Sequence, residues 1–403
     1  MFIDALLSAT ITTRNVKLYE RKFFMRLEQI RWMATSGWEP RQHGLLRDTA
    51  QLVMVFGDRT VFEKNGHIEE IKKAYPHAHL LGCTTAGEIC GTQVSDQSLV
   101  ATAIEFEHTR VMGSRIKIDE IKCSFKAGQT LADSLEKTEL VHVFVLSDGL
   151  GVNGSELVKG LTSRLPDNVS VTGGLSGDGD RFERTLVLWD DIPEKGVVAV
   201  IGLYGTRLKV GYGSLGGWDS FGPERLVTKS KGNVLYELDG KSALELYKRY
   251  LGEHAKGLPA TGLLFPLSLR NNGADTPVVR TILSVNEAEQ SMTFAGDVPE
   301  GSYARLMKAN FDRLIDGAAG AAKTSHQALL GSSPDLAILI SCVGRKMVLK
   351  QRVEEEVEGV RDIMGEKTVL TGFYSYGEIS PFTPNAKCEL HNQTMTITAF
   401  KEV

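Results

Sequence analysis

Two stretches of the chain, far apart in the sequence, have a hydroxyl residue and a carboxylate residue at the same numbers of positions after a glycine. They read GCTTAGEI at residues 82–89 and GFYSYGEIS at residues 372–380. Glu88 and Glu378 occupy equivalent places, each three positions after a hydroxyl residue. A carboxylate in this setting could bind the ammonium group of an amino-acid ligand, or it could cap the turn that follows.

Neighbouring residues in these stretches offer further ligand contacts. Gly82, Thr84 and Thr85 are small enough to let a ligand approach the backbone. Tyr374 and Tyr376 are two positions apart, so their rings point the same way if this stretch is extended. The two rings could stack on a planar ligand, or they could pack into the core.

The two stretches belong to a pattern that occurs three times. In each copy an apolar run, a helix-like stretch and a second apolar run lead to a glycine, and the middle copy ends in GGLSGDG at residues 173–179. A strand–helix–strand crossover has this order and lays two parallel strands side by side. The glycines therefore mark the ends of strands, where open α/β folds bind ligands, or they only permit sharp turns there. The apolar runs are 52–56 and 79–81, 141–146 and 169–172, and 336–340 and 368–371.

The length of the chain and these repeated units predict the domain organisation. A chain of 403 residues is longer than one hydrophobic core usually supports. We expect an α/β fold with two pseudo-repeated α/β domains, built from strand–helix–strand units with mixed β-sheets. The expected domains are residues 41–235 and 236–403, after an N-terminal extension at residues 1–40. The native chain would lack most of that extension if Met25 were its true start.

Composition and charge argue against several classes of function. A formal net charge of -4 gives no reason to expect a nucleic-acid partner. No apolar run approaches the roughly 18–20 residues of a membrane helix, and the first residues lack the pattern of a signal peptide. The odd number of scattered cysteines argues against a disulfide framework and fits a reducing compartment. We therefore expect a cytoplasmic protein that binds neither nucleic acid nor a membrane.

Catalytic motifs give little support to an enzyme. The chain contains no G-x-S-x-G or HExxH motif. Residues 211–216 match GxGxxG, but the GWDSFGP that follows cannot open the helix that a dinucleotide needs. Asp148 and Asp178 stand near turns, where carboxylates usually accept hydrogen bonds from loop amides. A sensor without catalytic activity is expected, and acid–base chemistry at these two residues is the alternative.

Three cysteines and one histidine are candidates for a metal centre. Cys83 and Cys90 flank the first glycine turn, and Cys388 lies three residues before His391. If the first and last stretches converge in space, three thiolates and one imidazole could hold an iron–sulfur cluster or zinc. The alternative is that Cys83 and Cys90 are small buried hydrophobic residues.

Several longer segments resemble, in order, the FIST family of intracellular signal-transduction modules, which have an N-terminal and a C-terminal FIST domain. The resemblance covers roughly residues 40–400. It implies sensing, with small ligands such as amino acids, and a signal that passes to a separate protein such as a histidine kinase. The segments are GCTTAGEI at 82–89, GW at 217–218, VTKSKGNVLYELDGKSALELYKRYLG at 227–252, RTILSVNEAEQSMTFAGDVPEGSYARLM at 280–307, YSYGEISP at 374–381 and LHNQT at 390–394.

The opening TSGWEP and the ending CELHNQTMTIT resemble the NosP subgroup of stand-alone FIST proteins. These are haem-binding nitric-oxide sensors that regulate a partner histidine kinase in two-component signalling. The resemblance implies haem held by one neutral imidazole, and His391 in the closing segment is the expected ligand, with His77 and His79 as alternatives. A metal-free sensor of a small organic ligand and an iron–sulfur or zinc sensor stay open, and so does a homodimer.

Overall fold

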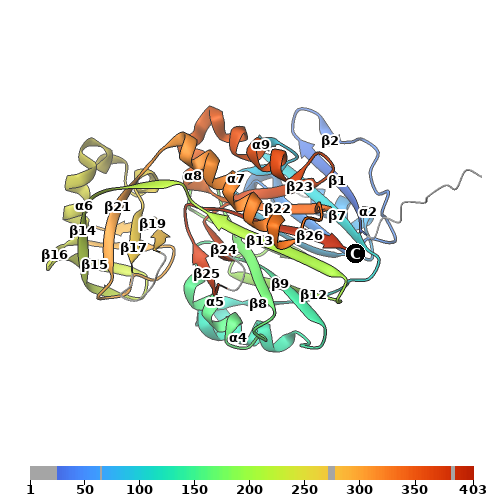
Figure 1. Ribbon diagram of the computed structural model, residues 1–403, viewed down its shortest axis with the longest axis horizontal. Coiled ribbons are helices and arrows are strands. Elements are labelled where there is room, and N and C mark those ends of the chain that lie inside the picture. Colours follow the sequence, from blue (N-terminus) through green and yellow to red (C-terminus); the bar gives the residue numbers. More distant parts are fainter. Residues whose placement is uncertain (1–24, 64–65, 271–276, 383–385) are drawn as a thin grey trace, which may run out of the picture.

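The protein is a mixed α/β structure in which helices pack on mixed β-sheets, as the sequence predicts (Figure 1). The computed structural model describes residues 25–63, 66–270, 277–382 and 386–403. The hypothesis of an extension before Met25 therefore falls outside the described residues.

Three stretches of the chain repeat one plan, and each builds most of one sheet. We call residues 25–106, 110–204 and 208–402 the first, second and third repeats. The third repeat is interrupted by residues 218–309, which form a fourth sheet that we call the inserted sheet. In Figure 1 the inserted sheet lies to the left of the three repeats as a separate lobe.

The first repeat contains the first predicted crossover. Its elements are β1 (Met25–Met33), β2 (Gly37–Glu39), β3 (Leu52–Gly57), α1 (Arg59–Phe62), α2 (His67–Ala74), β4 (His79–Thr84), β5 (Glu88–Cys90), β6 (Gln93–Ser95) and β7 (Ser98–Phe106). Strands β3 and β4 are parallel neighbours, and β7 and then β1 follow on the other side of β3. Strand β1, which the sequence assigns to an extension, pairs with β7 along its whole length.

The second repeat has the same order of strands, with parallel β9 and β10 beside antiparallel β12 and β8. Its elements are β8 (Arg110–Lys117), α3 (Ile118–Ile121), α4 (Ser124–Ser134), β9 (Leu140–Ser147), α5 (Gly154–Thr162), β10 (Ser170–Leu175), β11 (Val187–Trp189) and β12 (Val197–Tyr204).

The third repeat places parallel β22 and β23 beside antiparallel β26 and β13. The GxGxxG stretch belongs to β13, where a Cβ on Gly211 would lie 2.1 Å from a backbone oxygen of the covering helix α7, so this stretch is a packing surface. The elements are β13 (Leu208–Leu215), α7 (Phe311–Ala328), β22 (Leu336–Cys342), α8 (Val343–Leu349), η3 (Lys350–Arg352), α9 (Val353–Met364), β23 (Val369–Ser375), β24 (Gly377–Pro381), β25 (Cys388–His391) and β26 (Met395–Glu402).

The inserted sheet has a hydrophobic core of its own, to which the three repeats contribute no residue among those described. The predicted domain boundary at residues 235 and 236 falls inside this sheet, in β15. The elements are β14 (Trp218–Lys231), β15 (Val234–Leu238), β16 (Lys241–Ser242), α6 (Ala243–Leu251), η1 (Gly252–Gly257), η2 (Ala260–Leu264), β17 (Leu267–Arg270), β18 (Val278–Arg280), β19 (Ile282–Asn286), β20 (Ser291–Phe294) and β21 (Tyr303–Ala309).

Each repeat extends the sheet of another repeat: the first lends β5 and β6, the third lends β24 and β25, and the second lends β11. Strand β5 of the first repeat pairs with β23 of the third, β24 of the third pairs with β10 of the second, and β11 of the second pairs with β4 of the first. This exchange is cyclic, so no repeat has a complete sheet without the others.

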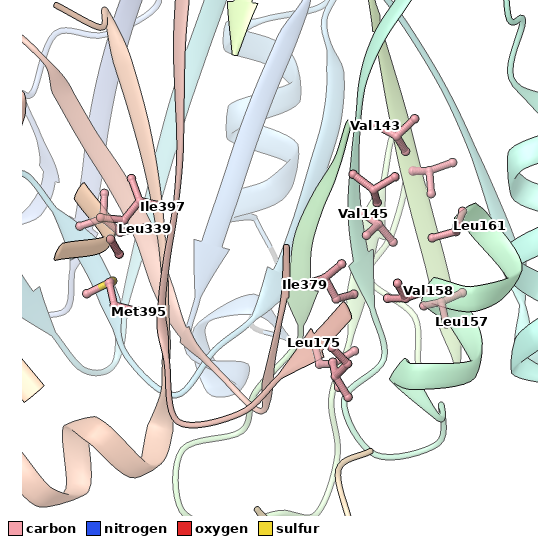
Figure 2. Packing of buried hydrophobic residues seen from close by; sticks show 14 of the residues in the cluster. Val143, Val145, Leu157, Val158, Leu161, Leu175, Leu339, Ile379, Met395 and Ile397 are labelled. Carbon is pink, nitrogen blue, oxygen red and sulfur yellow. The ribbon is translucent and has the colours of Figure 1, made fainter. Parts of the chain in front are cut away.

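The central strands of the three sheets are buried on both faces. Alternate residues of β3 belong to two different cores. Met54 and Phe56 face a central core shared by all three repeats, whereas Val53 and Val55 face helices. Figure 2 shows an outer core, where Leu157 and Leu161 of α5 pack on the second repeat's sheet. The exchanged strand β24 adds Ile379 to that core, so the exchange also buries apolar surface.

The three equivalent glycines are required by the close approach of two parallel strands. A Cβ on Gly82, Gly173 or Gly372 would lie 2.2, 1.9 or 1.9 Å from the carbonyl oxygen of the residue beside it on the neighbouring strand. No carbon atom can approach an oxygen so closely, so these positions exclude every side chain.

We predict that Gly372→Ala lowers the free energy of unfolding by about 3 kcal/mol or more, because the new methyl group collides with the carbonyl oxygen of Leu339. Urea denaturation measures the change. Gly359→Ala is the matched control: it lies in α9, its Cβ would meet only ordinary contacts, and it should stabilise the helix slightly. Equal stability of Gly372→Ala and the wild type would contradict the packing argument.

Candidate functional site

The three glycine stretches meet at the centre of the molecule and are joined by a cycle of backbone hydrogen bonds. The equivalent glycines are Gly82, Gly173 and Gly372. In each bond the donor is the backbone amide four residues after one glycine, and the acceptor is the carbonyl oxygen two residues after a different glycine. We call these six buried residues the central ring. The bonds run from Ala86 to Tyr374 (2.8 Å), from Gly177 to Thr84 (2.8 Å) and from Tyr376 to Leu175 (3.3 Å).

The carboxyl groups of Glu88 and Glu378 lie beside the central ring in equivalent surroundings. Both carboxyl groups are buried. In each group, one oxygen accepts a hydrogen bond from the hydroxyl of the residue three positions earlier. The other oxygen accepts from the backbone amide and the hydroxyl of a single residue. Protein groups thus bond all four oxygens. The partners are Thr85 and Ser98 (3.2 and 2.6 Å) for Glu88, and Ser375 (2.6 Å) and Thr394 (3.2 and 3.0 Å) for Glu378.

Burial raises the pKa of both carboxyl groups from 4.5 to about 8. Their hydrogen bonds oppose this shift, and so do the positive charges of Lys346 near Glu88 and Arg345 near Glu378. A protonated carboxyl group forms no ion pair with an ammonium group. Ligand binding by Glu88 and Glu378 therefore stays a prediction that this geometry does not favour.

Tyr374 and Tyr376 are buried among protein groups. The hydroxyl of Tyr374 donates to Glu356 (2.7 Å), which forms a fully buried ion pair with Arg345 (2.7 Å). The ring of Tyr376 stacks on Phe182, with centroids 4.3 Å apart and planes 9° apart. The planar group that the sequence predicts beside Tyr376 is thus supplied by the protein itself.

A cavity of about 910 Å³ lies between the second repeat and the inserted sheet. Its walls come from α5 and β10, from β25, and from β18 together with residues 297–299. Apolar side chains such as Val158, Val171 and Leu390 line much of it. The volume is typical of small-molecule sites. Of the predicted site residues only Cys388 belongs to the lining.

Arg280 lines this cavity and links the inserted sheet to the third repeat. Its Nε donates to the carbonyl of Asp297 (3.0 Å), and Nη1 donates to those of Val279 (3.1 Å) and Leu390 (3.0 Å). The side chain is only 6% exposed, and burial lowers its pKa to about 10. Arg280 is not among the site residues that the sequence predicts, although a charged side chain inside the apolar run VVRTIL is a usable signal.

Asp297 holds the opposite side of the cavity to the second repeat. Its carboxylate accepts from the amide of Asn153, the N-cap of α5 (2.9 Å), and from Lys159 (2.8 Å). The two walls of the cavity are therefore joined by hydrogen bonds at Asp297 and at Arg280.

His391 lies next to a residue of the cavity wall but does not line the cavity itself. The side chain is buried, and its Nε2 is 2.7 Å from the carbonyl oxygen of Ser380. The centroids of the His391 and Phe382 rings are 3.9 Å apart. Burial lowers its pKa to about 4, so the imidazole is neutral. Its Nδ1 has no hydrogen-bond partner among the described residues, which leaves one nitrogen that could bind a metal.

The alternative histidines lie in the first repeat, outside the lining of the cavity. His77 is exposed. His79 is 3.1 Å from a carboxylate oxygen of Asp190, which raises its pKa, and its ring stacks on Trp189.

The cysteines have separate surroundings. Cys83 packs in the central core, Cys90 donates to Gln29 (3.4 Å) and Cys388 donates to the carbonyl of Val171 (3.3 Å). Within residues 25–63, 66–270, 277–382 and 386–403, no three His, Cys, Asp or Glu side chains are grouped so that they could hold a metal ion. The iron–sulfur or zinc site stays a prediction without a geometric counterpart.

The two aspartates considered for acid–base chemistry are tied to loops. Asp148 accepts from the amides of Leu150 (3.0 Å) and Gly151 (2.6 Å). Asp178 forms ion pairs with Arg59 and Arg181. Both contacts are those of carboxylates that hold loops in place.

The closing segment, residues 391–394, connects the central ring to the inserted sheet. Asn392 donates to the carbonyl of Tyr376 (3.3 Å) and accepts from the amide of Thr281 (3.4 Å). Gln393 donates to the carbonyl of Leu263 (3.0 Å) and to the hydroxyl of Thr281 (3.0 Å). The closing segment thus contacts the inserted sheet and the ring, and Leu390, which precedes it, lines the cavity.

Comparison with known proteins identifies two adjoining domains. The FIST N domain matches residues 51–241, and the FIST C domain matches residues 243–381. An uncharacterized protein of Methanocaldococcus jannaschii is 25% identical over 338 residues, which cover 76% of this chain and 62% of that protein. The match therefore spans less than two thirds of the relative's length. None of the described helices is long and apolar enough to cross a membrane.

We predict that Glu378→Gln flattens the dependence of stability on pH. A carboxyl group with a folded-state pKa of about 8 stabilises the protein below pH 4.5, and this contribution is lost as the pH rises to about 8. Between pH 5 and pH 9 the variant should therefore gain stability relative to the wild type, by ~1.4 kcal/mol for each unit of pKa shift.

Urea denaturation at several pH values measures the difference, and Glu289→Gln, at an exposed position, is the control. If the free energy of unfolding depends on pH in the same way for Glu378→Gln and the wild type, burial does not shift the pKa of this carboxyl group.

Proposed function

This chain belongs to the FIST family, whose domains are signal-transduction sensors that bind small ligands, and we propose that its ligand occupies the cavity between the second repeat and the inserted sheet. One observation carries the proposal: the cavity walls come from the repeats and from the inserted sheet, which has a hydrophobic core of its own. A ligand that contacts both walls would favour one position of the inserted sheet over others. Such differential binding is what a sensor requires.

The closing segment is the route by which we expect occupancy of the cavity to reach the central ring. Leu390 lines the cavity, and the next residues bond to the inserted sheet and to Tyr376. The signal would pass to a separate protein, and the resemblance to NosP points to a histidine kinase. All five cysteines are free thiols, which suits the cytoplasm, the compartment that we propose.

Haem is a specific candidate for the ligand, and the unpaired Nδ1 of His391 is the observation that favours it. His391, which lies beside the wall residue Leu390 without lining the cavity, is the residue that would hold the haem iron. When bound, the haem would supply an iron that could bind nitric oxide. The other candidate is a metal-free organic molecule, which the cavity could hold without His391.

The haem candidate predicts a Soret band in protein expressed with a haem precursor, and a shift of that band when nitric oxide is added. His391→Gln should abolish the band, because glutamine can keep the bond to Ser380 but offers no imidazole. His142→Gln is the control, since this histidine is equally buried and both of its nitrogens have partners. Colourless, iron-free wild-type protein would contradict haem and favour a metal-free ligand.

The proposed route predicts that Gln393→Leu loosens the inserted sheet. The substitution leaves the carbonyl of Leu263 and the hydroxyl of Thr281 without their partner, which costs about 1–3 kcal/mol for buried groups. Hydrogen exchange should quicken in residues 258–309, with little change in β3 and β9. Gln290→Leu, at the exposed turn between β19 and β20, is the control. Exchange that quickens equally in all sheets would indicate general destabilisation and refute the route.

A further inference from the structure

We propose that the cavity contains an anion subsite, in which Arg280 binds a carboxylate or phosphate group of a partly apolar ligand. The inference rests on the proposed function, because it concerns the same cavity. It adds the chemical class of the ligand.

The guanidinium group of Arg280 is buried, and three of its five N–H donors are directed to backbone carbonyls. Nε and Nη1 are bonded, whereas Nη2 has no partner among the described residues. No carboxylate of those residues lies within ion-pair distance of this group. A buried charge without a counter-ion is costly, so a ligand that supplies one gains the energy of a charge-assisted hydrogen bond.

The neighbouring carboxylates do not fill this role. Asp297 directs its carboxylate to Asn153 and Lys159, and it offers Arg280 only its backbone carbonyl. Glu389 also lines the cavity, and its charge and that of Asp297 act on Arg280 through space, without a direct bond from either carboxylate. The positive charge of Arg280 therefore remains available on the cavity side.

Two further features of the cavity wall favour an anion, and the wall also carries the carboxylates of Asp167, Asp297 and Glu389. The N-terminal turn of α5 reaches the cavity through Ser155, whose hydroxyl accepts from the amide of Asp297 (3.3 Å). The positive end of the helix dipole favours an anion there. Lys387 also lines the cavity.

The rest of the lining defines the other part of the ligand. Val158, Val171, Val278 and Leu390 contribute apolar surface around the charged end. The cavity therefore suits a molecule with an acidic head and an apolar body, such as an alkyl carboxylate, an alkyl phosphate or a tetrapyrrole with propionate groups.

The test compares probes that differ only in charge. Octanoate and octanamide have the same chain, and isothermal titration of the full-length protein gives both dissociation constants. We expect octanoate to bind about tenfold to hundredfold more tightly, the range that a charge-assisted hydrogen bond supplies in a desolvated site. Arg280→Gln should remove this difference. Arg270→Gln should keep it, because Arg270 is an exposed residue of the same sheet that pairs with Glu224.

Equal affinities of octanoate and octanamide for the wild type would overturn the anion subsite and leave the ligand cavity standing. This comparison needs no variant, so it holds even if Arg280→Gln does not fold. Absence of binding by every probe, monooctyl phosphate and haemin included, would overturn the cavity proposal together with the subsite.

Further comparisons of probes distinguish a carboxylate, a phosphate and a haem propionate as the acidic group. Tighter binding of octanoate than of monooctyl phosphate assigns a carboxylate, and the reverse assigns a phosphate. Tighter binding of haemin than of its dimethyl ester, with a difference that Arg280→Gln abolishes, assigns the subsite to a propionate group.

Discussion

In the central ring, the amide of one repeat's turn bonds to the carbonyl of another repeat's turn, and the cycle closes after three bonds. Buried backbone groups need partners, and here each partner comes from a different repeat. The strand after each turn then enters another repeat's sheet. This geometry requires the absence of a Cβ at Gly82, Gly173 and Gly372. The three repeats consequently depend on one another for folding.

The ring uses up the polar groups that would otherwise suit a ligand. Glu88 and Glu378 bond to hydroxyls and amides of their own repeats, and Tyr376 stacks on Phe182. The ligand site that we propose lies away from the ring, where the inserted sheet contacts the second repeat. There Arg280 is a buried group with unused hydrogen-bonding capacity, and Leu390 and the closing segment link it to the ring.

Much of the fold could be predicted from the sequence, because glycine spacing and apolar runs report local strand–helix–strand geometry. The three crossovers were found in this way, and the turn at Gly173 was correctly grouped with those at Gly82 and Gly372. The exchange of strands could not be predicted, since β5, β11 and β24 are short and pair with strands distant in sequence. The cavity could not be predicted from the sequence for a related reason. Arg280 and Leu390 are 110 positions apart in sequence, and only the folded chain joins them.

The central claim is that a small molecule occupies the cavity. Native mass spectrometry of purified protein, compared with the mass of the same sample after denaturation, tests it most directly. We predict an added mass on the folded wild type that denaturation removes. The variant Val278→Trp, which fills the cavity from its inserted-sheet wall, should lack this mass. A folded wild type without added mass, or a mass retained by Val278→Trp, would contradict the account.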